Sequence, residues 1–78
     1  MNEKEFRQFC KDERLSYKRI DEGRAAWSEK EKKYFIWKKD GNYDFNNFST
    51  IAFSHLFEIE RVIRGKDGCL AIVRRKNL

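Results

Sequence analysis

The Lys and Arg residues are the side chains of this sequence that point most directly to chemistry. They outnumber Asp and Glu by 18 to 13, which gives a formal net charge of +5. The excess is largest in residues 58–78, with six Lys or Arg against three Asp or Glu. Such cations attract phosphates by Coulomb attraction and by release of counterions. We therefore expect a polyanion to meet the C-terminal part of the chain first.

The candidate nucleic-acid site combines cations with aromatic rings that stack on unpaired bases. The expected phosphate contacts are Lys33, Lys38, Lys39, Arg61, Arg64, Lys66, Arg74 and Arg75, and the expected stacking rings are Tyr34 and Trp37. Acidic residues interleave with these cations and weaken their field. The alternative interpretation is that the charges only solvate a small domain with an aromatic-rich core.

A competing hypothesis is a protein interface formed by Phe53 and Phe57. Together with the two Trp residues, they exceed what one helix face covers in a domain this small. Surface aromatic residues are typical of binding hot spots. The chain would then be a small modulator, an inhibitor or adaptor of the kind phages and mobile elements encode, which docks a protein target or a second copy of itself. A dimeric core remains the structural alternative.

The segment Gly65-Lys66-Asp67-Gly68 resembles the GxxG loop of KH domains, which holds a nucleic-acid backbone between two helices. The resemblance covers four residues and implies a helix after the loop. The next residues, 70–73, form a continuous apolar run that is typical of a strand. A helix end followed by a β-turn accounts for both glycines without a function.

Catalysis is not the expected function. His55 is the single histidine, and beside Arg61 or Arg64 it would suit acid–base chemistry on a phosphate. However, it falls on an apolar flank, where a half-buried structural role is expected. Cys10 and Cys69 lie in apolar runs that favour inert thiols. Without metal-ligand spacing or a phosphate-binding loop, we expect no enzyme, no metal and no small-molecule cofactor.

Four elements are expected around these residues in addition to the long helix described below. Asn2 and Glu5 form a capping box that predicts a helix over about 2–14. Residues 15–22 stay open between an extension of that helix and a loop. Two strands are predicted at roughly 23–28 and 33–39, with one helix over 28–39 as the alternative. Residues 69–73 predict a third, buried strand.

The strongest predicted element is a long amphipathic helix over about 44–64. Asp44 supplies the N-cap and Gly65 the stop. At helical spacing the apolar arc spans most of the circumference, along a stripe formed by Phe45, Phe48, Ala52, Leu56, Ile59 and Ile63. The expected fold is a single α+β domain over 1–78, of order α-β-β-α-β, with a short antiparallel or mixed three-stranded sheet packed on this helix.

The sequence also indicates a soluble chain. It contains no apolar run long enough to span a membrane and no signal peptide after its first residues. We therefore expect a cytoplasmic protein whose two thiols are free.

Overall fold

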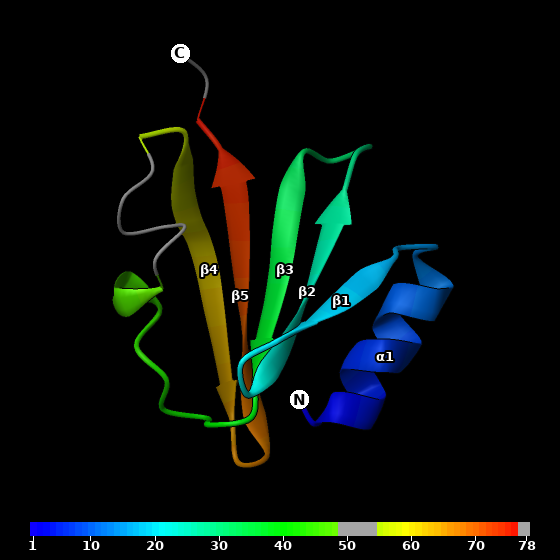
Figure 1. The fold of residues 1–78 in the computed structure, drawn as a ribbon, viewed down its shortest axis with the longest axis vertical. Coiled ribbons are helices and arrows are strands. Elements are labelled where there is room, and N and C mark those ends of the chain that lie inside the picture. The colour runs from blue at the N-terminus through cyan, green and yellow to red at the C-terminus, as the bar shows by residue number, and fades with distance from the viewer. Residues whose placement is uncertain (49–54, 77–78) are drawn as a thin grey trace.

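The computed structural model describes residues 1–48 and 55–76 (Figure 1). The elements in chain order are α1 (Glu3–Asp12), β1 (Tyr17–Ile20), β2 (Gly23–Ser28), β3 (Lys33–Lys38), the 3-10 turn η1 (Phe45–Asn47), β4 (Phe57–Gly65) and β5 (Gly68–Arg75). Within this part of the chain the strands form one five-stranded sheet of order β1-β2-β3-β5-β4. All neighbouring strands are antiparallel.

The predicted long helix over 44–64 is wrong, and with it the three-stranded sheet packed on that helix. Asp44 does cap a turn, since its Oδ1 accepts from the Asn46 amide at 3.0 Å, but η1 has only three residues. Residues 49–54, including Phe53, lie outside the described residues. From Phe57 onward the chain is strand β4, paired with β5. The fold is therefore a mostly β domain with one short helix.

A β-bulge explains why β4 resembled a helix. The register with β5 shifts between Ile59 and Arg61, so Glu60 is an extra residue. Phe57 and Ile59 before the bulge, and Val62 after it, all pack on the same core cluster. The strict alternation of a strand is lost at the bulge, and the apolar residues then fall at helical spacing.

The other elements follow local sequence signals. The capping box is confirmed, because Glu5 N donates to Asn2 Oδ1 at 2.8 Å and Asn2 N donates to Glu5 Oε1 at 3.0 Å. The two strands predicted at 23–28 and 33–39 are confirmed as β2 and β3, so the helix alternative is wrong. Both alternatives for residues 15–22 are wrong, because this segment contains strand β1. Residues 69–73 lie in β5, as predicted.

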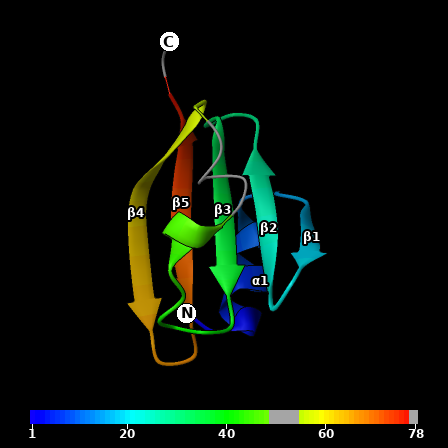
Figure 2. The same cartoon turned by 60° about the vertical axis from the view of Figure 1, so that its left-hand side comes forward.

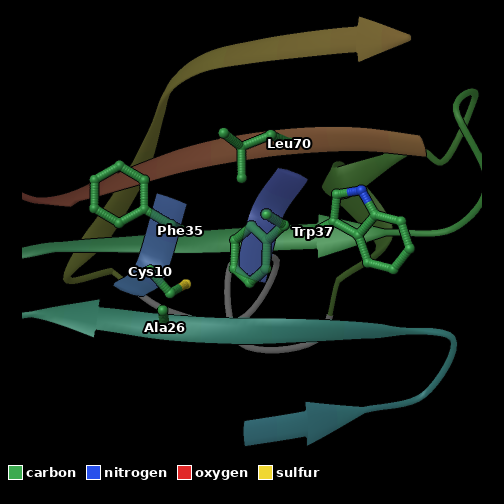
Figure 3. Close-up of a cluster of buried hydrophobic side chains, with 6 residues drawn as sticks. Cys10, Ala26, Phe35, Trp37 and Leu70 are labelled. Atoms are coloured by element: carbon green, nitrogen blue, oxygen red, sulfur yellow. The ribbon is translucent and has the colours of Figure 1, made fainter. Parts of the chain in front are cut away.

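Both faces of the sheet are covered. The helix α1 lies on one face, and η1 lies on the other (Figure 2). The first core cluster joins Phe6 and Cys10 of α1 to Ala26, Phe35, Trp37 and Leu70 of the sheet (Figure 3). The second joins Phe45 of η1 to the opposite face, formed by Ile36, Cys69, Ala71 and Val73. Burial of a Phe side chain stabilises the fold by about 1.5–3 kcal/mol. Phe6 therefore holds α1 against one face of the sheet, and Phe45 holds η1 against the other.

Polar contacts secure the covering segments to the sheet. An Arg64 guanidinium nitrogen donates to the carbonyls of Gly41 at 3.1 Å and Tyr43 at 2.9 Å. On the other face, Trp37 Nε1 donates to the Met1 carbonyl at 2.8 Å. Both cysteines are buried and free, as expected. No helix in the described residues is long and apolar enough to cross a membrane.

Candidate nucleic-acid interface

The cations predicted to contact phosphates do not form one patch. Lys33, Arg74 and Glu58 lie in register across β3, β5 and β4, and Arg74 forms an ion pair with Glu58. Lys33 Nζ lies 3.0 Å from Glu60 Oε2. Two of the predicted contacts are therefore neutralised by acids that β4 brings beside them.

Two further predicted contacts hold the fold together. Arg64 binds the backbone carbonyls described above. Lys38 is only 6% exposed, its Nζ donates to the Asp21 carbonyl, and it lies 4.6 Å from the Tyr43 ring centroid. The charge of Lys38 is thus directed into the protein.

Replacement of Lys38 by methionine is expected to lower the free energy of unfolding by about 2 kcal/mol, because a hydrogen bond to a charged group is lost while the apolar stem is kept. Thermal unfolding measures this change. Affinity for polynucleotides should stay the same. A loss of affinity without a loss of stability would restore Lys38 as a surface contact.

The remaining predicted cations are exposed but scattered. Lys39 and Lys66 lie at the end of the sheet that carries the β1–β2 and β4–β5 turns, the lower end in Figure 1. Arg75 lies at the opposite end, paired in register with Phe57, and Arg61 lies on the edge strand β4. No common surface joins these four side chains.

The two aromatic residues predicted to stack on bases also pack in or against the core. Trp37 is 4% exposed and its indole N–H is bonded to Met1. Tyr34 is half-buried between Trp27 and Phe57, with ring centroids 4.5 Å and 5.4 Å away. Phe57 packs against the second core cluster from strand β4. The interface expected on the flank of a long helix therefore has no basis, and His55 lies exposed before β4 rather than on a helix.

A different basic surface lies along α1. Lys4, Arg7 and Lys11 recur at helical spacing within an arc of about 60°. Together with Gln8, Leu15 and Tyr17 they line an open groove of about 570 Å³ between α1 and β1. Within the described part of the chain, the side chains of these three cations have no salt bridge or hydrogen bond. Two acids of α1 have partners of their own: Glu5 belongs to the capping box, and Asp12 accepts from Gln8.

The first hairpin adds two arginines to this surface. Arg19 of β1 and Arg24 of β2 are directly opposite in register, an arrangement that is unfavourable for like charges. Arg24 Nε donates to Glu3 Oε1 at 2.7 Å, and its guanidinium lies 5.1 Å from the Tyr17 ring centroid. Tyr17 is 37% exposed.

One carboxylate, Glu3, lies among these arginines. The hydrogen bond from Arg24 lowers the pKa of Glu3, and the nearby charges of Arg24, Arg7 and Arg19 lower it further. We call this region the α1–β1 surface and define it by Glu3, Lys4, Arg7, Lys11, Tyr17, Arg19 and Arg24. Five cations against one acid, which forms an ion pair with Arg24, leave this surface with a net charge of +4, which suits an anion of several charges.

The sequence contained only part of the signal for this surface. The spacing of Lys4, Arg7 and Lys11, opposite the buried Phe6 face, was visible in the sequence. The net charge of residues 1–24 concealed it, because the six acids of this segment nearly cancel its seven cations. The pairing of Arg19 with Arg24 depends on a hairpin that the sequence did not identify.

Comparison with known proteins adds no assignment: no family model, curated protein or solved structure matches this chain.

Proposed function

We propose that this domain is a non-enzymatic binder of single-stranded nucleic acid, and that it holds phosphates on the α1–β1 surface. The observation that carries the proposal is that Arg24, bonded to Glu3 of α1, lies opposite Arg19 next to the cation-lined groove of α1. A guanidinium binds phosphate oxygens through two parallel hydrogen bonds, which an ammonium does not match. A phosphate placed between Arg19 and Arg24 relieves the repulsion between the two opposed charges.

The polymer is expected to be single-stranded because an aromatic ring lies among the cations. Tyr17 keeps part of its ring open to solvent beside the groove. Stacking on such a ring requires an unpaired base. The groove between α1 and β1 then follows the backbone, with Lys4, Arg7 and Lys11 along one wall.

Fluorescence anisotropy with labelled oligonucleotides over a range of salt concentrations tests the proposal. Each phosphate neutralised on a single strand contributes about −0.7 to the slope of log affinity against log salt, so four or five contacts predict a slope of about −3. Absence of binding to any polynucleotide at low salt would refute the function.

The double variant Lys4→Glu/Lys11→Glu locates the site. It is expected to lose at least about tenfold in affinity, since each phosphate contact is replaced by repulsion. The matched control Lys30→Glu/Lys76→Glu makes the same change in net charge at the upper end of the sheet and should retain most of the affinity. Equal losses in the two variants would show that only the overall charge matters.

A further inference from the structure

A pocket at the lower end of the sheet continues the α1–β1 surface. It has a volume of about 430 Å³, within the range of about 300–1,000 Å³ for small-ligand sites. Arg19, Arg24 and Lys39 line it, with Trp37 and Ile20 as apolar contacts. Because Arg19 and Arg24 belong to both the surface and the pocket, a strand that follows the groove brings its phosphates to the mouth of this pocket.

Three carboxylates line the same pocket: Glu3, which is bonded to Arg24, and two others. Glu22 belongs to the β1–β2 turn and Asp67 to the β4–β5 turn, both at the lower end of the sheet (Figure 1). In the described residues neither carboxylate has a salt bridge or hydrogen bond from its side chain. A strand that continued past the pocket would bring further phosphates toward these like charges. Repulsion therefore favours a strand that stops here.

We infer that this pocket receives the terminal nucleoside of a single strand that ends in a hydroxyl group, with the last phosphate between Arg19 and Arg24. The inference rests on the proposed function and specifies its substrate. Carboxylates accept hydrogen bonds from sugar hydroxyls and base amino groups, and a strand end supplies a hydroxyl donor that an internal nucleotide lacks. Ile20 supplies apolar contact to the base.

The test compares a linear oligonucleotide with hydroxyl groups at both ends and the circular form of the same sequence, by competition against a labelled linear strand. The linear form is expected to bind about tenfold more tightly, which corresponds to one hydrogen bond to a charged acceptor. A phosphate added to the strand end that enters the pocket should remove the tighter binding of the linear form. Equal affinity of circle and line would overturn the inference while the proposed function stands.

A variant identifies the residue responsible. Asp67→Lys is expected to raise the affinity of the circle to that of the linear strand, because the repulsion beyond the pocket is reversed. The control Glu31→Lys makes the same charge change in the β2–β3 turn and should keep the preference for the linear strand. If Asp67→Lys keeps the preference as well, the carboxylate does not select strand ends. If neither form binds the wild-type protein, the proposed function and this inference both fail.

Discussion

The variant Phe6→Ala is expected to lower the free energy of unfolding by about 3–5 kcal/mol, the cost of removing a large buried side chain. Phe6 has no exposed surface and joins α1 to the first core cluster. A domain of this length has a total stability of about 4–12 kcal/mol, so the loss consumes a large share of it. Urea unfolding followed by circular dichroism measures the change.

Phe9→Ala is the matched control for this variant. Phe9 lies on the same helix but is only partly buried, so its loss should cost about half as much. A ten-residue helix is marginal without tertiary packing, and Phe6→Ala should therefore also weaken nucleic-acid binding through α1. A destabilisation below about 1 kcal/mol would mean that other contacts hold α1 to the sheet.

Gly68→Ala is expected to destabilise the domain by about 3 kcal/mol or more, because the cost of backbone strain adds to the cost of overpacking. Gly68 has φ of 145°, which L side chains rarely adopt. A Cβ there would lie 2.5 Å from Trp37 Nε1 and 2.8 Å from the Met1 carbonyl oxygen. The variant thus strains the β4–β5 turn and displaces the contact that holds the N-terminus. Thermal unfolding, with Trp fluorescence as the readout, reports both changes.

Gly65→Ala in the same turn provides the comparison. Its Cβ would meet the Met1 amine at 2.7 Å and the Gly68 carbonyl oxygen at 3.2 Å. The terminal amine can move, so this loss should be clearly smaller than that of Gly68→Ala. Equal melting temperatures for Gly68→Ala and the wild type would contradict the structural role of this glycine.

The structure of the same turn differs from that of a KH loop. Gly65 and Gly68 are opposite in register and close the β4–β5 hairpin around Lys66 and Asp67. A KH loop is followed by a helix, whereas Gly68 begins strand β5. The β-turn interpretation of these glycines is correct, and the helix end expected before them is wrong.

Elements specified by adjacent residues were predictable. The helix α1 follows from a capping box that needs only residues three positions apart. Strands β2 and β3 follow from short apolar runs bounded by turn residues. Strand β1 carried no such signal, because it has four residues and three of them are exposed.

The interface depends on pairings between distant residues, and these were not predictable. Lys33 is neutralised by Glu60 only because the strand order brings β4 within reach of β3. Lys38 is buried although lysine is among the most exposed residue types. The sequence therefore predicted a basic protein, while the positions of its unpaired cations depend on strand order.

The strand order also constrains when the domain folds. Strand β5 lies between β3 and β4, and its residue Ile72 is opposite Phe35, half the chain away. Contacts between distant residues slow folding, because the entropy of closing a long loop is lost before the contacts form. During synthesis, β3 has no partner on one side until β5 leaves the ribosome. The strands made before β5 should therefore stay incompletely paired, and the full sheet should form only once β5 is available.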